Sequence, residues 1–371
     1  MIFFSPNYII LSDLDPLMTF SHNLISWYHK NKRDLPWRKT DDLYHIWVSE
    51  IIMQQTRVAQ GTQYYHRFLE RFPDIISLVE ADESEVLKIW QGLGYYSRAR
   101  NMHEAARQIL NDHNGIFPSD YKSLIKIKGI GSYTAAALLS FGYNLPYPVI
   151  DGNVKRILSR LFAIDQPINS PKAETLFIEK LNTIFDTKNP ADFNQAIMEF
   201  GALQCKPGLP DCPVCVFNKI CIANKQGTVG QYPLIAKKAA EIKRYLYYIV
   251  PVFYRGTTAF TFIQKRSAND IWKNLYEFPL IEANRALSVE EVLMTDEFIA
   301  MFPQEYKVKS ASAPLVHKLT HRTIHARFIW IELKSPLKKT HLPEIKLSDI
   351  RSLPVSRLTD KYLNSINYFG L

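Results

Sequence analysis

Residues 20–200 carry apolar side chains at three- and four-residue intervals, the spacing that places them on one face of an α-helix. Turn-forming stretches such as RFPD, NGIFPSD and NLPYP separate these segments. No convincing alternation of polar and apolar positions, which would indicate a strand, occurs between them. The first amphipathic helix is expected to open at Met18, with residues 1–17 as an N-terminal extension. The pattern therefore predicts an all-α domain over residues 18–225.

The pattern changes after a stretch rich in Gly, Pro and Lys at residues 226–240, which is predicted to be a linker. Beyond it, apolar runs are rich in β-branched and aromatic residues, as is typical of strands. Three such runs are RYLYYIVPVFY, TAFTFIQKR and HARFIWIEL. One helix is expected among them, over SVEEVLMTDEFIAMF at residues 288–302. The predicted fold class is thus multidomain, with an α+β domain over residues 241–371 after the all-α domain.

Length and charge narrow the classes of protein. A chain of 371 residues is too long for one ordinary core, and it contains no apolar run long enough to cross a membrane. The apolar N-terminus has neither a basic start nor a small-residue cleavage site, so it is a poor signal peptide. The formal net charge is +9. Residues 1–236 contain 24 Lys and Arg against 23 Asp and Glu, whereas residues 237–371 contain 21 against 13. A polyanionic partner would therefore meet local basic clusters in the first domain.

All four cysteines lie within 17 residues, in CKPGLPDCPVCVFNKIC. They are Cys205, Cys212, Cys215 and Cys221. Four thiolates in one short loop can bind zinc or a [4Fe–4S] cluster. Structural zinc sites more often use two C-x2-C pairs, and this loop has one, so the cluster is favoured. Because the cysteines are clustered rather than spread as in disulfide-rich secreted proteins, a reducing compartment is expected.

The stretch KSLIKIKGIGSYTAAALLSF predicts a helix-hairpin-helix over about residues 121–140. Its first helix is expected to end at Lys128, and Gly129 and Gly131 are expected to form a tight turn that leaves backbone amides uncovered. Such amides, together with the next helix N-terminus, suit a DNA phosphate. The alternative is a plain corner between two helices, with glycines for geometry alone.

Two carboxylates are candidates for chemistry. Glu50, in VSEIIMQQT, falls on an apolar arc of its predicted helix, where burial would raise its pKa and suit a general acid. The alternative is a buried glutamate paired with Arg38 or Arg57. Asp151, in VIDGN, precedes a helix; it is either a helix N-cap or a carboxylate beside developing positive charge, and the two roles are compatible.

The stretch GLGYYSRARN combines aromatic and basic side chains, as nucleic-acid sites do. Tyr95 and Tyr96 follow glycine turns and precede Arg98 and Arg100. The alternative is that the tyrosines belong to the core and the arginines to the solvated surface.

Taken together, KGIGSYTAAA, VIDGN and the cysteine loop resemble the endonuclease III superfamily of DNA glycosylases. The stretches LPWR, VSEIIMQQT, GLGYYSRARN, IDGNVKRIL and FNQAIMEFGALQC are similar to its MutY-type adenine DNA glycosylase branch. The resemblance is close over about residues 20–225. It is weaker over residues 241–371, where that family carries a Nudix-like domain.

The resemblance implies removal of adenine opposite 8-oxoguanine (or guanine) in duplex DNA, with the adenine flipped into a pocket. Glu50 would protonate the adenine, and Asp151 would stabilise the oxocarbenium-like sugar, with Tyr133 and Asn153 supporting the site. By position, the residues lining the adenine pocket would be Arg33, Trp37, Arg38 and Gln195. Gln55 and Tyr95 would wedge into the base stack.

Tyr133 bears on the choice between two reaction types. Related bifunctional lyases carry a lysine at this position, and no lysine occurs between Lys128 and Lys155. A monofunctional glycosylase is therefore expected. The alternatives are an endonuclease III-like lyase acting on oxidised pyrimidines and a non-enzymatic iron–sulfur DNA-binding protein.

The second domain lacks the glutamate-rich helix with which Nudix hydrolases bind Mg²⁺, so pyrophosphatase activity is not expected. The resemblance instead implies reading of 8-oxoguanine by Leu319, Thr320 and His321, where Leu319 stands in place of the family's aromatic residue. The alternative is a histidine at a strand edge without a ligand.

Further expectations concern partners. The expected partner is double-stranded DNA with an adenine·8-oxoguanine mispair, bound by a monomer in a bacterial cytoplasm, at the nucleoid and without a membrane. Lys206 and Lys219 of the cysteine loop are expected to face DNA phosphates.

Overall fold

The computed structural model of the chain describes residues 16–236, 241–267, 270–319, 321–338 and 340–366. The predicted extension over 1–17 lies almost wholly outside these residues, and the first helix begins at Pro16. The chain divides into two compact units, each discontinuous in sequence. One contains residues 1–55 and 111–237, and the other contains residues 56–110 and 238–371. Within the described residues, no helix is both long and apolar enough to span a bilayer.

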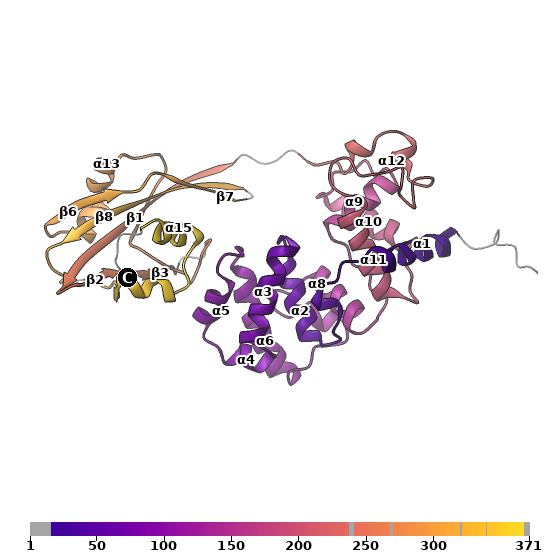
Figure 1. The fold of residues 1–371 in the computed structure, drawn as a ribbon, viewed down its shortest axis with the longest axis horizontal. Helices are drawn as coiled ribbons and strands as arrows, with labels where there is room; N and C mark the ends of the chain where they lie inside the picture. Colours follow the sequence, from indigo (N-terminus) through magenta and orange to yellow (C-terminus); the bar gives the residue numbers. More distant parts are fainter. Residues whose placement is uncertain (1–15, 237–240, 268–269, 320, 339, 367–371) are drawn as a thin grey trace, which may run out of the picture. The chain divides into compact units, whose positions relative to one another are not determined.

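The first unit is helical, as predicted (Figure 1). Its elements in chain order are α1 (Pro16–Asn31), η1 (Pro36–Arg38), α2 (Leu43–Met53), α7 (Tyr121–Leu124), α8 (Ser132–Ala137), η2 (Leu138–Gly142), α9 (Gly152–Leu161), α10 (Pro171–Asn182), α11 (Pro190–Leu203), α12 (Ile222–Lys225) and η3 (Val229–Gln231). η2 is a π-helical turn that continues α8.

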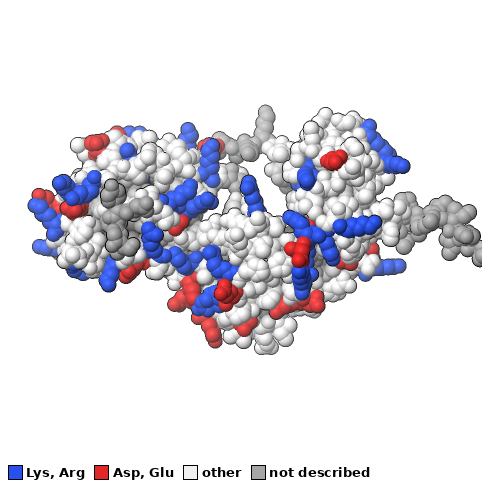
Figure 2. Space-filling model, in the orientation of Figure 1, with Lys and Arg blue, Asp and Glu red and all other residues white. Residues whose placement is uncertain are grey.

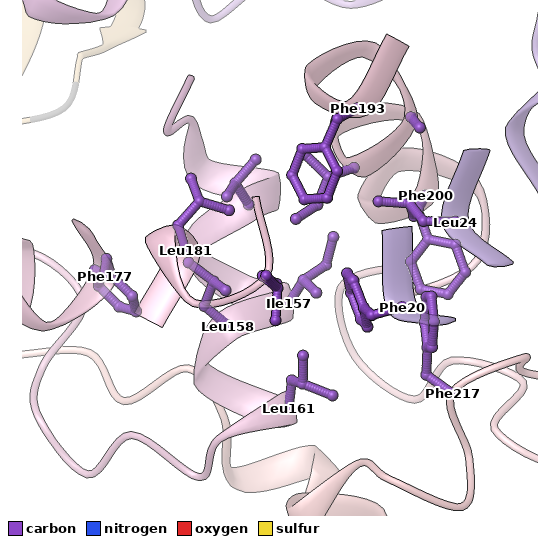
Figure 3. Packing of buried hydrophobic residues seen from close by; sticks show 14 of the residues in the cluster. Phe20, Leu24, Ile157, Leu158, Leu161, Phe177, Leu181, Phe193, Phe200 and Phe217 are labelled. Carbon is purple, nitrogen blue, oxygen red and sulfur yellow. The ribbon is translucent and has the colours of Figure 1, made fainter. Parts of the chain in front are cut away.

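Helix α9 organises one core of this unit. Val154, Ile157, Leu158 and Leu161 recur at helical spacing, and all four are buried against α1, α10 and α11 (Figure 3). Phe217 of the cysteine loop stacks on a phenylalanine of α1, with ring centroids 4.3 Å apart. The loop is therefore anchored in the hydrophobic core of the helices.

The predicted linker is partly anchored to the segment between α9 and α10. Ile168 N donates to Leu234 O at 2.8 Å, and the Tyr232 hydroxyl donates to Ala163 O at 3.5 Å. Residues 237–240 of that linker lie outside the described residues.

The first helix of the hairpin is shorter than predicted. α7 ends at Leu124, and the chain then continues in tight turns, with Lys126 N bonded to Ser123 O and Ile127 N bonded to Leu124 O. The expected end at Lys128 is wrong because these three-residue turns replace the last turn of the α-helix.

The second unit combines four helices with the C-terminal domain. The helices are α3 (Val58–Arg71), α4 (Ile75–Glu80), α5 (Glu83–Trp90) and α6 (Ser97–His113), whose last residues belong to the first unit. Lys88 Nζ of α5 donates to Arg351 O at 2.6 Å and to Leu353 O at 3.2 Å. Gln91 Nε2 donates to Asp360 Oδ1 at 3.1 Å. The segment 56–110 of the predicted all-α domain thus packs with the C-terminal domain.

The C-terminal domain is built on a seven-stranded sheet in the order β6-β8-β1-β2-β9, with β5 also paired to β1 and β7 to β8. Its strands are β1 (Ile242–Arg255), β2 (Thr258–Phe262), β5 (Leu280–Ala283), β6 (Tyr306–Ala311), β7 (Leu315–Lys318), β8 (Arg322–Leu333) and β9 (Glu344–Lys346). β1 and β8 run parallel, and the other pairs are antiparallel. β3 (Gln264–Lys265) and β4 (Tyr276–Glu277) form a separate pair.

Helices cover both faces of this sheet. On one face, Tyr247, Ile249 and Phe253 of β1 share a core with α13 (Val289–Leu293) and α14 (Asp296–Met301). On the other face, Phe328 of β8 stacks between Tyr248 of β1 and Tyr362 of α15 (Arg357–Ser365). Helix α15 follows η4 (Leu347–Ser352). The α+β prediction is confirmed, but the single helix expected over 288–302 is two helices. Thr295 accepts a hydrogen bond from Phe298 N and so caps a new helix.

Candidate active site

Glu50 lies near the end of α2 and is 8% exposed. Asp42 caps the start of this helix, and almost every later side chain of α2 is buried, which leaves Glu50 little access to water. Its Oε2 accepts a hydrogen bond of 2.7 Å from the Tyr133 hydroxyl. Burial raises the pKa of Glu50 to about 7; the hydrogen bond from Tyr133 opposes that rise, and the charge of Asp151 adds to it. Glu50 is therefore a carboxyl that can both hold and release a proton near neutral pH.

The alternative pairing of Glu50 with Arg38 is not what the side chains form. Arg38 lowers the pKa of Glu50 by its charge, but its guanidinium donates to Glu199 and to Gln195. Tyr133 itself is buried, and burial raises its pKa well above 10.0, so its hydroxyl keeps its proton and remains a donor.

Asp151 caps helix α9 and has a second bond as well. Its Oδ1 accepts from Val154 N at 2.8 Å, and its Oδ2 accepts from Asn153 Nδ2 at 2.7 Å. Burial raises the pKa of Asp151, and these two hydrogen bonds oppose the rise. The N-cap reading is therefore correct, and the charge of Asp151 also raises the pKa of Glu50.

The turn before α8 delivers Tyr133 to this site. Gly129 has φ 79°, a left-handed conformation that other residues seldom adopt. Gly131 has φ −88°, which any residue can adopt, and serves as the N-cap of α8. A β-carbon at Gly131 would meet no atom within 4 Å, so its position faces open space.

A pocket of about 410 Å³ lies in the first unit, next to α2. Four of its lining residues are those assigned to a purine pocket from the sequence motifs: Arg33, Trp37, Arg38 and Gln195. Ile46 also lines it, one helical turn before Glu50. The structure thus brings the four predicted residues together and places them near the acidic group.

Glu199 holds this pocket together, and the sequence reading did not single it out. It is 1% exposed and accepts from Arg33 Nε and Nη2 at 2.8 and 2.7 Å, and from Arg38 Nη2 at 2.9 Å. Burial alone would raise its pKa, but the hydrogen bonds from the two arginines lower it to about 2. Gln195 and Glu199 lie four residues apart and so on one face of α11, but the sequence could not show that this face meets Arg38.

The four cysteines line one pocket, together with Arg160. Arg160 Nη1 donates to Cys205 Sγ and Phe217 N donates to Cys215 Sγ, both at 3.4 Å. Donors aimed at sulfur, and a buried cation beside it, fit a thiolate-bound iron–sulfur cluster. Burial raises the pKa of Cys215 to about 11, so a bound metal would have to displace its proton. No group of three His, Cys, Asp or Glu in the described residues is arranged around a single ion.

Arg156 links the cysteine loop to Asp151, and this connection was also missed. Its Nε donates to Cys205 O at 2.9 Å, and its Nη2 donates to Asn153 Oδ1 at 2.9 Å. Asn153 then donates to Asp151. Asn153 also packs closely against Gly201. A β-carbon at Gly201 would lie 2.6 Å from the β-carbon of Asn153. The loop therefore helps to orient the carboxylate, which spacing in the sequence could not indicate.

The two predicted wedge residues share an unusual backbone. Gln55 has φ 53° and Tyr95 has φ 46°, and both side chains are exposed. Tyr96, in contrast, is buried, and Arg98 lies over the rings of Trp90 and Tyr95. The stretch thus contains one core tyrosine and one exposed tyrosine. Residues with a strained backbone and an exposed side chain occur preferentially at functional sites. Gln55 and Tyr95 belong to different units.

The remaining predicted residues lie at the surface. Lys206 and Lys219 are exposed on the cysteine loop, and His321 is exposed just before β8. Thr320 lies outside the described residues. On the face that Figure 2 draws, Lys and Arg side chains are interspersed with acidic ones.

Comparison with known proteins defines the class of protein first. Residues 48–182 match the HhH-GPD superfamily of base excision DNA repair proteins, and residues 251–365 match the NUDIX domain. The structure of a thermostable thymine-DNA glycosylase is similar with TM-score 0.52 and 26% identity, over 57% of this chain and 97% of that one. A trapped endonuclease III–DNA covalent intermediate has TM-score 0.50 and 19% identity, over 57% of this chain and 96% of that chain, a likeness of fold alone. The fold is that of the helix-hairpin-helix glycosylases.

The relatives identify the branch. The adenine DNA glycosylase of Buchnera aphidicola subsp. Schizaphis graminum is 35% identical over 318 residues, which are 85% of this chain and 88% of that protein. That of Rattus norvegicus is 38% identical over 238 residues, 62% of this chain and 46% of that protein. The chain belongs to the family of MutY-type adenine DNA glycosylases, hydrolases of N-glycosyl bonds. The family and the domain types predicted from the motifs are confirmed.

Proposed function

We propose that the protein removes adenine mispaired with 8-oxoguanine, or with guanine, from duplex DNA by acid-assisted hydrolysis of the N-glycosyl bond. The observation that carries the proposal is the buried Glu50 carboxyl with a pKa of about 7, hydrogen-bonded to Tyr133 and influenced by the charge of Asp151. Two carboxyl groups with different environments are the arrangement that glycosidic-bond hydrolysis uses. Adenine DNA glycosylases are its relatives.

Glu50 supplies the first proton. The flipped adenine enters the pocket lined by Arg33, Trp37, Arg38 and Gln195. Protonated Glu50 donates its proton to N7 of the base. The N-glycosyl bond then breaks, its electron pair goes to the base, and the base leaves as neutral adenine. Tyr133, whose hydroxyl stays protonated, holds the Glu50 carboxyl in one orientation. An acid with a pKa near 7 is suited to such a transfer at neutral pH.

Asp151 acts on the sugar. Loss of the base leaves an oxocarbenium-like ion, which an ionised carboxylate stabilises electrostatically without forming a bond. Asn153 and the start of α9 hold Asp151 by two hydrogen bonds. Water then adds to the sugar, the proton it releases restores the acid form of Glu50, and the hydrolysis is complete.

The reaction stops at base release because the site lacks an amine nucleophile. The position that carries the lysine in related lyases is Tyr133, and its hydroxyl is bonded to Glu50. Strand cleavage through a Schiff base would need a lysine there. Incubation with mispaired duplex, without alkali or heat, should release adenine and leave the strand intact.

Contacts with DNA are distributed along the chain. We assign phosphate contacts to the amides around Gly129 and Gly131, with Lys206 and Lys219 as further cationic contacts. Gln55 and Tyr95 are assigned as wedges in the base stack. Leu319, Thr320 and His321 are assigned to the base opposite adenine. The protein would act as a monomer on DNA in a bacterial cytoplasm, at the nucleoid.

The cysteine loop would hold a [4Fe–4S] cluster through Cys205, Cys212, Cys215 and Cys221. When bound, the cluster cross-links the loop and takes no part in base release. Arg160 compensates its negative charge, and Arg156 transmits the loop's position to Asn153.

The test is Glu50→Gln, measured for binding and for single-turnover release of adenine from adenine·8-oxoguanine, adenine·guanine and adenine·cytosine duplexes. Glutamine keeps the size and the acceptor for Tyr133 but cannot donate a carboxyl proton. Binding should remain while release is lost. Retained release would refute the role of Glu50, and equal rates of the parent protein on all three duplexes would refute recognition of the opposite base.

A further inference from the structure

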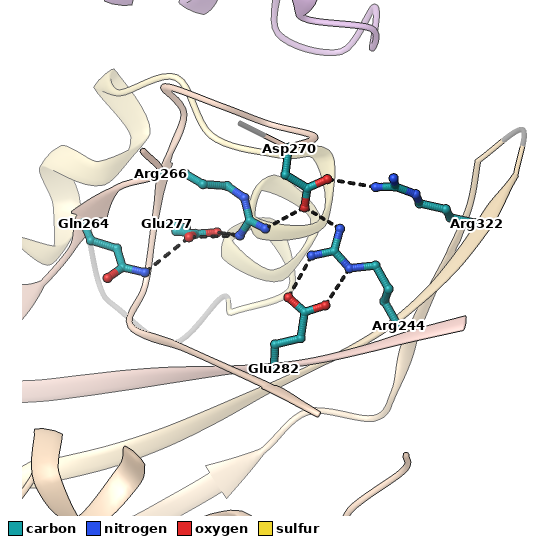
Figure 4. Close-up of polar contacts among 7 residues, drawn as sticks. All are labelled: Arg244, Gln264, Arg266, Asp270, Glu277, Glu282 and Arg322. Atoms are coloured by element: carbon teal, nitrogen blue, oxygen red, sulfur yellow. Dashed lines mark hydrogen bonds and ion pairs between the residues drawn. The ribbon is translucent and has the colours of Figure 1, made fainter. Parts of the chain in front are cut away.

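Three arginines converge on Asp270 in the C-terminal domain (Figure 4). Its Oδ1 accepts from Arg322 Nη1 at 2.8 Å, and its Oδ2 accepts from Arg266 Nη2 at 3.2 Å and from Arg244 Nη1. Burial alone would raise the pKa of Asp270, but the hydrogen bonds from Arg244 and Arg322 hold it well below its usual range. Asp270 is therefore charged whenever the domain is folded near neutral pH.

Two of these arginines have carboxylate partners of their own. Arg244 of β1 binds Glu282 of β5 through Nε and Nη2, at 2.6 and 2.7 Å. Arg266 binds Glu277 at 3.0 and 3.1 Å. Among the described residues, the ion pair of Arg322 is with Asp270. The pair with Asp270 thus connects the first residue of β8 to a network that joins β1, β4 and β5.

Arg322 follows the stretch that connects β7 to β8. Leu319 N donates to Arg322 O at 2.8 Å. Ile242 N, at the start of β1, donates to His321 O at 3.1 Å. Backbone bonds therefore hold the described residues on both sides of residue 320.

The loop that carries Asp270 contacts the hairpin a second time. Trp272 lies against His317 of β7, with ring centroids 6.0 Å apart. Trp272 has φ 62°, a conformation that a large side chain adopts only when its surroundings impose it. One loop thus holds the hairpin through an ion pair on β8 and a ring contact on β7.

We propose that Asp270 is a positioning residue for recognition of the base opposite adenine, acting through Arg322. The inference rests on the proposed function, which assigns that recognition to the stretch just before Arg322, where the structure describes Leu319 and His321. 8-Oxoguanine differs from guanine by an oxygen on C8 and a proton on N7, so a protein tells them apart by a few placed donors and acceptors. Such contacts tolerate little displacement. The ion pair with Asp270 keeps the start of β8 in register with the network beneath it.

The geometry favours positioning over simple stabilisation of the sheet. Arg322 is 38% exposed at its side chain and Asp270 is 22% exposed, so their pair contributes less to stability than a buried pair. The pairs of Arg244 and Arg266 already connect the strands underneath. What the Arg322 pair adds is a fixed place for the start of β8.

The experiment uses the full chain with Arg322→Gln and Asp270→Asn, singly and together. Adenine release is measured under single-turnover conditions from adenine·8-oxoguanine and from adenine·guanine duplexes. The ratio of the two rates should fall about tenfold in each single variant, through a larger loss on the 8-oxoguanine duplex. The ratio in the double variant should be no lower than in the single variants, because either substitution alone already removes the ion pair.

The matched control is Glu344→Gln. It removes a carboxylate that binds Arg255 Nη2 at 2.9 Å, at the opposite end of β1. Its ratio of rates should equal that of the parent. The thermal midpoints of all variants are measured, so that a loss of stability can be separated from a loss of discrimination. An equal fall of the ratio in Glu344→Gln would overturn the proposal.

Three outcomes separate this inference from the proposed function. A parent protein without preference for 8-oxoguanine over guanine would refute the proposed function itself. A parent with that preference, and an unchanged ratio in a folded Arg322→Gln variant, would refute the role of the ion pair alone. Should Asp270→Asn unfold, Arg322→Gln decides, because it leaves the pairs of Arg244 and Arg266 in place.

Discussion

The pKa of Glu50 predicts how adenine release depends on pH. The pKa of Glu50 is raised from 4.5 to about 7 because burial disfavours the charged form of the carboxyl group. If its acid form carries the reaction, the rate should be nearly constant below about pH 7. Above that, it should fall about tenfold per pH unit, because the protonated fraction falls in the same proportion.

The same shift has a consequence for stability, and its sign can be worked out. A carboxyl whose pKa is higher in the folded state binds its proton more tightly there. Stability is therefore lost as pH rises from about 4.5, the unfolded value, through about 7, the folded value. The whole shift corresponds to about 3 kcal/mol, at 1.36 kcal/mol per pKa unit. Glu50→Gln removes this cost, so the variant should be more stable than the parent above neutral pH and similar to it near pH 4.5.

Two measurements test these statements. The second-order rate constant for adenine release, determined at enzyme concentrations well below saturation, reports the groups of the free enzyme. Thermal midpoints of the parent and Glu50→Gln, taken at several pH values, report the same pKa without any catalysis. A rate that does not change between about pH 6 and about pH 9 would refute Glu50 as the acid. A stability difference between the two proteins that is independent of pH would refute the raised pKa.

Other predictions concern the supporting groups. Glu199→Gln should cost about 3–5 kcal/mol of stability, because it leaves two arginines without their buried carboxylate, and denaturant unfolding at neutral pH measures this. In the parent, the contribution of Glu199 should be present above about pH 4.5 and be lost as pH falls through about 2, which acid unfolding of parent and variant compares. Asn153→Leu should slow adenine release more than it weakens DNA binding, since it removes a hydrogen bond to Asp151; equal losses would contradict this. The protein as isolated should absorb broadly in the visible range, as iron–sulfur clusters do, whereas a colourless protein with stoichiometric zinc would contradict the cluster.

The sequence predicted those parts of the site that depend on local pattern. The burial of Glu50 followed from its place on an apolar helical arc, the N-cap at Asp151 from its place before a helix, and the clustering of the cysteines from their spacing. The strand runs after residue 240 were predicted for the same reason, since β-branched and aromatic residues are local signals. The break at Thr295 also had a local signal, a threonine followed by two acidic residues, which is typical of a new helix N-terminus.

The supporting residues could not be predicted in this way. Glu199 is meaningful only because α11 brings it to Arg33, which lies 166 residues away in the sequence. The same holds for Arg156, which reaches Cys205 across 49 residues. Such contacts depend on how helices pack, and periodicity along one helix shows which face is buried but not what it meets. The division of residues 18–225 between two compact units was hidden for the same reason.

That division limits how freely the C-terminal domain can be exchanged between proteins. Lys88, Gln91 and Tyr96 each donate a hydrogen bond to residues 351–360, and Tyr96 is buried. A chimera that joined this helical part to a foreign C-terminal domain at residue 240 would leave these donors without their partners. A transplant that functions would need to carry the surface of α5 and the turn after it as well. What must be exchanged together is therefore the compact unit formed by residues 56–110 and 238–371, whose contacts lie far from the peptide linker in the sequence.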